Sequence, residues 1–266
     1  MPGQSGGSTA LTGCIVVVTR PSPGPLARRL ADAGATVRHV PLIEVRSPAD
    51  SSALTDAIAR LGDHTWLVVT SANGAAAVGE APRSHPGVRL GAVGPATAAA
   101  LQDRAGRPVD LVPGRASVEG LLDEFPSPAR AGESVLVVQA DRAGDDLARG
   151  LRSRGYHVTT VAGYRTVLRR PTADEEATLR SADVVVLASG SAAESLAAES
   201  LAAMATTSAA HRSGPQLVAI GPSTTAAAVT AGLRMSAVAR SPRPEDVVAA
   251  VVGVVEDRRS SAPGLT

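Results

Sequence analysis

The sequence predicts an α/β protein of two pseudo-equivalent domains, each built on a parallel sheet of the flavodoxin-like or Rossmann-like type. Short β-branched runs alternate with Ala-rich stretches of helical character along the whole chain. The runs are continuously apolar, which is typical of parallel strands covered by helices on both faces. Later stretches also repeat earlier ones, which indicates a duplicated unit.

Each expected strand is an apolar run of strand length, followed by a stretch with helix signals. Pro95 and Pro222 stand at first-turn positions of expected helices. Gly34, Gly155 and Gly232 stand where a helix ends and the next strand begins. The expected strands are Ile15–Thr19, Thr36–Val40, Trp66–Thr70, Arg89–Val93, Val109–Val112, Val135–Gln139, His157–Val161, Asp183–Ala188, Gln216–Ile220 and Met235–Ala239.

The internal repeat supports two domains. Ile15–Arg20 aligns with Val135–Ala140, and each is followed by a Leu-Ala-Arg helix and a glycine. Further along, Gly94–Thr97 aligns with Gly221–Thr224 in a shared Gly-Pro-x-Thr pattern. The repeat is far longer than a solenoid repeat, so two similar α/β domains are the better interpretation.

The composition excludes several classes of protein. Hydrophobic residues make up 44% of the chain but aromatic residues only 2%, so the core must consist of Ala, Val and Leu. A net charge of +1 argues against a protein that binds nucleic acid by neutralising phosphates. Every basic residue is Arg, and the absence of Lys excludes a lysine Schiff base, a pyridoxal-phosphate lysine and a Walker A lysine.

Cysteine usage and hydropathy bear on location. Cys14 is the only cysteine, so no intrachain disulfide can form, and a cytoplasmic location is expected. The longest apolar runs fall far short of the roughly 20 residues that span a membrane, so no membrane association is expected. The start of the chain lacks the charged and apolar regions of a signal peptide. Residues 1–13 and 257–266 are expected to be disordered.

The turns that follow the predicted strands indicate a binding site. Ligands of open parallel sheets bind outside the carboxyl ends of the strands, and free N–H groups at helix N-termini favour carboxylate or phosphate. Any single Ser or Thr there is better explained as a helix cap, so the prediction depends on the whole set. These turns are Thr19–Pro21, Thr70–Gly74, Gly94–Thr97, Ser189–Ser191 and Gly221–Thr224.

Other catalytic patterns are missing from the sequence. There is no Gly-x-Ser-x-Gly, and no Gly-x-Gly-x-x-Gly follows the first strand. Tyr164, one of two tyrosines, is a candidate weak acid or hydrogen-bond donor, with a purely structural role as the alternative. The histidines are scattered, with no pair at metal-ligand spacing; they are His39, His64, His85, His157 and His211.

Six short motifs occur in order along the chain: Val18–Pro21, Pro41–Glu44, Thr70–Gly74, Ala92–Thr97, Tyr164–Thr166 and Ile220–Thr224. In this order and spacing they resemble the uroporphyrinogen-III synthase family, from about Cys14 to Val255. No single motif is specific, so their succession carries the resemblance. The sequence departs from the family at Gln139–Arg142, where a more Gly-rich turn is expected, and that turn is assigned no role.

The resemblance implies that the two domains are interleaved. Residues 14–40 and 168–256 would form one domain, and residues 50–160 the other. Residues 41–46 and 162–167 would be the two strands of a ladder connecting them. The repeat alone does not predict this exchange of segments.

The resemblance also implies an activity, that of a hydro-lyase (a carbon–oxygen lyase) in porphyrin, tetrapyrrole and heme biosynthesis. Such an enzyme cyclises the linear tetrapyrrole hydroxymethylbilane, with loss of water and inversion of the terminal pyrrole ring, to uroporphyrinogen III. No metal or organic cofactor is implied. The expected partners are this small-molecule substrate and, for a transient handover, hydroxymethylbilane synthase, with no nucleic acid and no membrane. The protein is expected to be a monomer.

The resemblance assigns roles to individual residues. Tyr164 matches the family tyrosine that assists departure of the hydroxyl group. Arg20 would form a charge-assisted pair with a substrate carboxylate. The other expected substrate-binding residues carry hydroxyl or amide groups in the turns described above: Ser71, Asn73, Thr97, Ser189, Ser191, Ser223 and Thr224. Two alternatives stay open, a non-catalytic two-domain protein that binds an anionic ligand and a regulatory protein that has lost catalysis.

Overall fold

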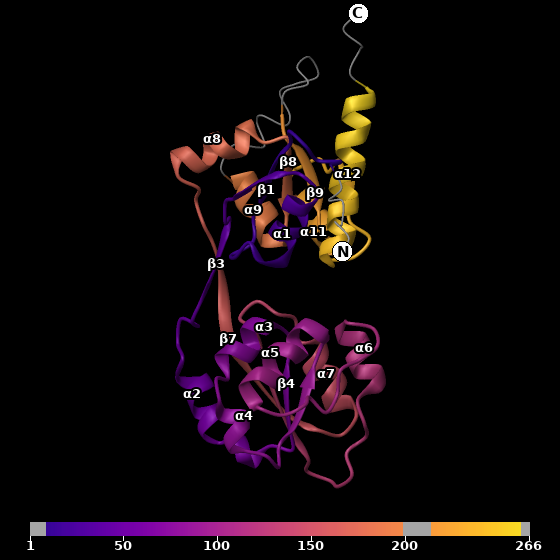
Figure 1. Cartoon of the computed structure of the whole chain (residues 1–266). Coiled ribbons are helices and arrows are strands. Elements are labelled where there is room, and N and C mark those ends of the chain that lie inside the picture. Colours follow the sequence, from indigo (N-terminus) through magenta and orange to yellow (C-terminus); the bar gives the residue numbers. More distant parts are fainter. Residues whose placement is uncertain (1–8, 199–213, 262–266) are drawn as a thin grey trace, which may run out of the picture. The chain divides into compact units, whose positions relative to one another are not determined.

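The computed structural model describes residues 9–198 and 214–261. The chain divides into two compact units, unit 1 with residues 1–44 and 167–266, and unit 2 with residues 45–166. Each unit contains a sheet with helices packed against it (Figure 1). The predicted α/β class with parallel sheets is therefore confirmed.

The sheet of unit 1 has the strand order β2-β1-β8-β9-β10, and its neighbouring strands are parallel. Numbered along the chain within this unit, the order is 2-1-3-4-5, as in flavodoxin-like folds. The direction of the connections reverses between β1 and β8, which makes the end of these two strands the expected ligand position. The strands are β1 Ile15–Val18, β2 Thr36–His39, β8 Val184–Leu187, β9 Gln216–Ala219 and β10 Ala237–Val238.

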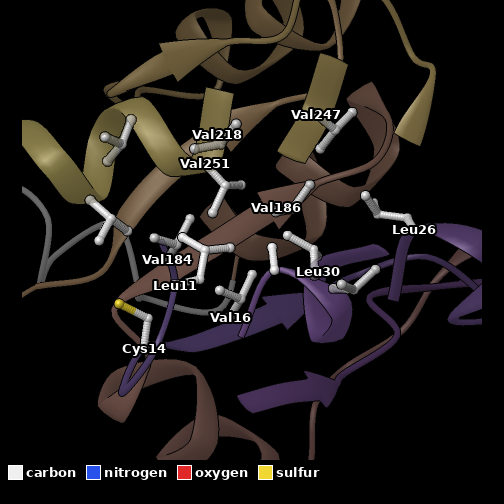
Figure 2. Packing of buried hydrophobic residues seen from close by; sticks show 14 of the residues in the cluster. Leu11, Cys14, Val16, Leu26, Leu30, Val184, Val186, Val218, Val247 and Val251 are labelled. Atoms are coloured by element: carbon white, nitrogen blue, oxygen red, sulfur yellow. The ribbon is translucent and has the colours of Figure 1, made fainter. Parts of the chain in front are cut away.

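The hydrophobic core of unit 1 lies on both faces of its sheet, because successive residues of a strand point to opposite sides. Val16 packs with α1 and α12, whereas Val17 packs with α8, α9 and α11. Figure 2 shows the first face, where Val184 and Val186 lie among Leu30 of α1 and Val251 of α12. The helices are α1 Gly24–Asp32, α8 Ala173–Ser181, α9 Gly190–Ala198, α11 Pro222–Thr230 and α12 Pro244–Ser260.

The expected disorder of residues 1–13 and 257–266 is wrong where the structure describes them. Leu11 is fully buried in the unit 1 core, and its N–H donates a hydrogen bond to the Ala33 carbonyl. Helix α12 continues to Ser260, and Arg259 donates hydrogen bonds to the carbonyls of Ala10 and Thr12. The burial of Leu11 and the hydrogen bonds of Arg259 thus hold residues 9–13 in place against unit 1. Residues 1–8, 262–266 and His211 lie outside the described residues.

The sheet of unit 2 has the strand order β3-β7-β6-β4-β5. Its β4–β5, β4–β6 and β6–β7 pairs are parallel, so the strands from β4 onward again follow the flavodoxin-like order. The boundary between the units falls inside both β3 and β7. The strands are β3 Ile43–Arg46, β4 Trp66–Val69, β5 Arg89–Ala92, β6 Ser134–Ala140 and β7 His157–Leu168.

Two unit 2 strands differ from expectation. β7 continues past Val161, where the apolar pattern predicts its end, to Leu168, and so includes residues 162–167, which the family resemblance expects to be a strand. The expected strand Val109–Val112 forms only one isolated bridge, between Leu111 and Gly91. Pro113 follows it directly and lacks the N–H that a longer ladder requires.

The unit 2 sheet is also covered on both faces. Leu67 packs with α2, α3 and α5, whereas Val68 packs with α6 and α7. On the second face the Phe125 ring lies between Trp66 and Tyr156. Its centroid is 4.8 Å from that of the Trp66 ring and 5.5 Å from that of the Tyr156 ring. No helix of the described ranges is long and apolar enough to cross a bilayer. The helices are α2 Ser52–Ala59, η1 Leu61–Asp63, α3 Ala72–Ala77, α4 Ala81–Ser84, α5 Pro95–Ala105, α6 Val118–Glu124 and α7 Asp146–Ser153.

Candidate active site

Ser71 lies directly after β4 and caps helix α3. Its backbone is extended (φ −156°, ψ 163°), and its Oγ accepts a hydrogen bond of 3.1 Å from the N–H of Gly74. The same Oγ donates a hydrogen bond of 2.9 Å to the hydroxyl of Tyr164. Both side chains are half-buried. The structure therefore joins two of the residues singled out from the sequence.

Tyr164 reaches Ser71 from β7, two strands away in the sheet. The β6–β7 register shifts after Gln139, so that Ala140 pairs with Tyr164 and Gly163 has no partner residue in β6. Such irregularities redirect side chains and are common near active sites. The Tyr164 carbonyl accepts a hydrogen bond of 2.9 Å from the N–H of Asp141, which fixes its backbone.

Gly163 is a site residue that sequence reasoning missed. A Cβ at this position would lie 2.6 Å from Val138 Cγ1 and 3.1 Å from Ala77 Cβ, closer than packed carbon atoms approach. The glycine therefore lets β7 lie directly against α3, which brings Tyr164 within reach of Ser71. The sequence did offer a signal for this role, because a glycine inside a strand, as in Ala162–Tyr164, often marks a bulge or the close approach of another segment.

Tyr156, the other tyrosine, has a different environment. Its side chain is 4% exposed, and its hydroxyl donates a hydrogen bond of 3.2 Å to the Pro126 carbonyl. Burial, reinforced by the negative charge of Glu133, raises the pKa of Tyr156. Tyr156 is thus a structural residue, and Tyr164 is the more exposed of the two tyrosines.

The remaining unit 2 candidates are exposed to different degrees. Asn73 lies exposed in the first turn of α3. Thr97 lies in the first turn of α5 and is 8% exposed, so it faces the protein more than the solvent. Gly94 makes the turn before α5, where an added Cβ would lie 2.9 Å from Ala116 Cβ. Helices α3 and α5 pack against each other, so both residues lie on one side of the sheet.

In unit 1, the carboxyl ends of β1 and β8 are tied together by Thr19. Its fully buried hydroxyl donates a hydrogen bond of 2.8 Å to the Val186 carbonyl and accepts one of 3.4 Å from the N–H of Ala188. Arg20 follows and is half-buried. Within the described residues, the Arg20 guanidinium forms no ion pair with a carboxylate. Arg20 is therefore a charged donor without a carboxylate partner in the described part of the chain.

The other unit 1 candidates follow β8 and β9, which are neighbours in the sheet. Ser189 Oγ accepts a hydrogen bond of 3.1 Å from the N–H of Ala192 at the start of α9, so it is a cap. Ser191 is half-buried and Ser223 is exposed, whereas Thr224 is 3% exposed. Adjacent parallel strands lie about 4.8 Å apart, so the turns after β1, β8 and β9 form one continuous edge.

Gly190 is a second glycine that the sequence reading missed. A Cβ there would lie 2.8 Å from Ala227 Cβ, so its absence allows α9 and α11 to pack closely behind this edge. No group of three or more His, Cys, Asp and Glu side chains in the described part of the chain is arranged to hold a metal ion. The candidates at the two edges thus offer hydroxyl groups, backbone N–H groups, the amide of Asn73 and the guanidinium of Arg20.

Comparison with protein families gives one match over most of the chain. The model described as Uroporphyrinogen-III synthase HemD matches residues 24–249. A curated Uroporphyrinogen-III synthase of Synechococcus elongatus is 31% identical over 165 residues, 59% of this chain and 62% of the relative. A Porphyrin biosynthesis protein HemD of Ruminiclostridium josui is 31% identical over 171 residues, 59% of this chain and 32% of the relative. The alignments thus span less than two thirds of either relative.

Solved structures support the fold. A mutant uroporphyrinogen III synthase of Thermus thermophilus superimposes with a TM-score of 0.58 at 19% identity, covering 92% of this chain and all of the other. The uroporphyrinogen-III synthetase of Helicobacter pylori gives a TM-score of 0.59 at 16% identity, and the superposition covers 91% of this chain and 99% of the other. At these identities the likeness establishes the two-domain α/β fold. None of these comparisons supports the binding-protein or regulatory alternative.

Proposed function

The chain belongs to the uroporphyrinogen-III synthase family, and we propose on that basis that it converts hydroxymethylbilane to uroporphyrinogen III. The family match over residues 24–249 carries this proposal. The half-buried hydroxyl of Tyr164, held at the carboxyl edge of a parallel sheet, supplies a mechanism.

The proposed reaction begins with loss of the substrate's hydroxyl group. The C–O bond of the hydroxymethyl carbon breaks, the oxygen leaves as water after gaining a proton, and an electrophilic azafulvene remains. The already substituted carbon of the terminal pyrrole attacks this centre and gives a spiro intermediate. That intermediate fragments and recloses with the terminal ring inverted, and a proton is lost. Water is the only product besides the macrocycle, so the enzyme is classified as a carbon–oxygen lyase.

We assign the proton donor of the first step to Tyr164. A phenol can protonate or hydrogen-bond the departing oxygen, and positioned acids of this kind contribute roughly 10²–10⁴-fold to a rate. The alternative tyrosine is unsuitable, because Tyr156 is buried and its hydroxyl is bonded to a carbonyl. The selection of Tyr164 thus follows from accessibility as well as from the family motif.

Substrate carboxylates are the proposed ligands of the candidates other than Tyr164 and Ser71. Arg20 follows β1, has no carboxylate partner among the residues that the structure describes, and would bind a substrate carboxylate by charge-assisted hydrogen bonds. Ser191, Ser223 and the first-turn N–H groups of α9 and α11 would bind others, since these helix starts attract anions. Because hydroxymethylbilane closes without inversion when free, the main task of these contacts is to hold one conformation.

The oligomeric state, the location and the source of the substrate also follow from the family resemblance. We propose a monomer located in the cytoplasm that receives its substrate from hydroxymethylbilane synthase. The single, buried cysteine is compatible with a reducing compartment. Size-exclusion chromatography with light scattering tests the monomer, and a dimer at micromolar concentration would contradict it.

A coupled assay tests the activity. Freshly generated hydroxymethylbilane is supplied, the products are oxidised and the uroporphyrin isomers are separated. Predominance of isomer III over the spontaneous isomer I is expected. A hundredfold preference would correspond to about 2.7 kcal/mol of selective transition-state stabilisation. Isomer I alone, formed at the rate of the buffer control, would disprove the synthase proposal and favour a protein that only binds the ligand.

A further inference from the structure

The hydroxyl group of Ser71 takes part in two hydrogen bonds, accepting one from Gly74 and donating the other to Tyr164. The N–H of Gly74 can only donate, so Ser71 Oγ is the acceptor in that bond of 3.1 Å. A serine hydroxyl has a single hydrogen, and Ser71 directs it to the Tyr164 oxygen at 2.9 Å. The Tyr164 oxygen is therefore an acceptor on the side facing Ser71.

This arrangement determines where the Tyr164 proton can point. Because the Ser71 hydrogen occupies the line between the two oxygens, the phenolic hydrogen must turn away from Ser71. Tyr164 is half-buried, and no second partner of its hydroxyl group is found among the described residues, so we assign the phenolic hydrogen to a bound molecule. When Tyr164 gives up its proton, the phenolate that forms accepts the Ser71 hydrogen bond more strongly than the phenol does.

The surrounding packing keeps the two hydroxyl groups in place. Gly163 seats β7 against Val138 and Ala77, as described above. On the other side, Gly74 lies so close to β6 that an added Cβ would be 3.2 Å from the Val138 carbonyl oxygen. Both partners of the Ser71–Tyr164 bond thus stand on backbone that has little room to move.

We propose that Ser71 is a positioning residue that aims the Tyr164 proton at the departing hydroxyl group, rather than a ligand of a substrate carboxylate. This proposal rests on the proposed role of Tyr164 as the acid. It revises the role that the family resemblance implies for Ser71, because the single hydroxyl hydrogen of Ser71 is already donated to Tyr164. Ser71 then affects the chemical step and not the affinity for the substrate.

Unit 2 contains a matched control for the capping role. Ser117 stands in the same Ser-x-x-Gly pattern, and its Oγ accepts a hydrogen bond of 3.0 Å from the N–H of Gly120 at the start of α6. No tyrosine hydroxyl is bonded to Ser117 within the described residues. Ser117→Ala therefore removes a cap and a contact with the exposed Glu119 side chain, whereas Ser71→Ala removes a cap and the bond to Tyr164.

The kinetic test compares these two variants in the full chain. Ser71→Ala is expected to lower kcat for isomer III about tenfold, the factor for one hydrogen bond of ordinary strength, with KM changed less than twofold. Ser71→Thr, which keeps a hydroxyl, should restore most of kcat, and Ser117→Ala should leave both constants unchanged. In a Tyr164→Phe background, Ser71→Ala should have no further effect. A rise in KM at unchanged kcat, or a full effect in the Tyr164→Phe background, would overturn the proposal.

A spectroscopic test separates this inference from the enzymatic activity. The chain has only two tyrosines, so 3-fluorotyrosine labelling gives two ¹⁹F resonances, which Tyr156→Phe assigns. Ser71→Ala should shift the Tyr164 resonance, and Ser117→Ala should leave it in place. An unshifted Tyr164 resonance would overturn the positioning role even if isomer III is made. A shifted resonance without isomer III would support the hydrogen bond and leave only the synthase proposal disproved.

Discussion

Ser71 donates a hydrogen bond to Tyr164 although 93 residues separate them in the sequence. The contact exists because β4 and β7 run parallel and present their carboxyl ends at the same edge of one sheet. The local sequence determines that Ser71 caps a helix and that Tyr164 lies in a strand. The strand order of the sheet determines that the two side chains come into contact, and the predictions below depend on this contact.

Tyr164→Phe removes the proposed proton donor and keeps the ring. We expect kcat for isomer III to fall by about 10²–10⁴-fold, because a positioned acid contributes that much, while KM stays within a factor of about two. The measurement is steady-state formation of isomer III in the coupled assay. An unchanged kcat would exclude Tyr164 as the acid.

Tyr156→Phe is the matched control for that variant. It removes the hydrogen bond to the Pro126 carbonyl from a buried side chain, so unit 2 should lose roughly 1 kcal/mol of unfolding free energy. Activity per folded molecule should stay at the level of the unaltered protein. A loss of kcat here as large as for Tyr164→Phe would point to a general effect of tyrosine removal.

Gly163→Ala tests the close approach of β7 to α3. The added Cβ would meet Val138 Cγ1 at 2.6 Å, so we expect a loss of about 1–3 kcal/mol in unfolding free energy together with a reduced kcat. Fluorescence of Trp66, the only tryptophan, reports the unfolding of unit 2 directly. Gly87→Ala, in the same unit and with no atom within 4 Å of the added Cβ, should stay within about 0.5 kcal/mol.

The sequence was sufficient to predict much of the fold. The central strands of both sheets, such as β4 and β8, are continuous apolar runs because they are buried on both faces. The predicted disorder at the start of the chain and the predicted strand Val109–Val112 were wrong, because in each segment a single residue matters more than the composition of its neighbours. Leu11 packs into the core within residues 9–13, for which disorder was expected, and the run Val109–Val112, directly before Pro113, forms a single bridge.

The candidate site was predictable in part. The turns with hydroxyl groups at the strand ends were visible because ligand position follows from parallel topology. The roles of Gly163 and Gly190 were not, since a glycine required for close packing cannot be distinguished by composition from one in a flexible turn. The bond that occupies Ser71 likewise depends on an atom from a distant segment, the hydroxyl oxygen of Tyr164. The capping role of Ser189 is local and agrees with the helix cap expected from the sequence for any single Ser in these turns.

Arg20→Ala tests carboxylate binding at the unit 1 edge. We expect KM to rise about tenfold at nearly unchanged kcat, because a charge-assisted hydrogen bond contributes roughly 1.5–3 kcal/mol and this contact is made throughout the reaction. Arg28→Ala removes the same charge from an exposed position of α1 and should leave KM unchanged. Equal increases in KM for both variants would indicate long-range attraction in place of a specific contact.

Glu175 links the stability of unit 1 to pH. The side chain of Arg169 donates hydrogen bonds of 2.9 and 3.0 Å to it and holds the pKa of Glu175 below its ordinary value of 4.5. The N–H of Thr172 lowers this pKa further, against the opposing effect of burial. A carboxyl whose pKa falls on folding stabilises the protein fully above its unfolded pKa, and this stabilisation is lost as the pH falls through the folded value.

Glu175→Gln should therefore lower the unfolding free energy of unit 1 by about 1–2 kcal/mol at neutral pH, and this difference should shrink as the pH falls below about 4.5. Hydrogen-exchange protection of α8, measured from pH 7 to pH 3, reports this locally. Glu176→Gln breaks only the more exposed pair with Arg180, 3.3 Å away, and should cost no more than roughly 0.5 kcal/mol. A Glu175→Gln difference that stays constant down to pH 3 would mean that the ionised carboxylate does not stabilise this helix start.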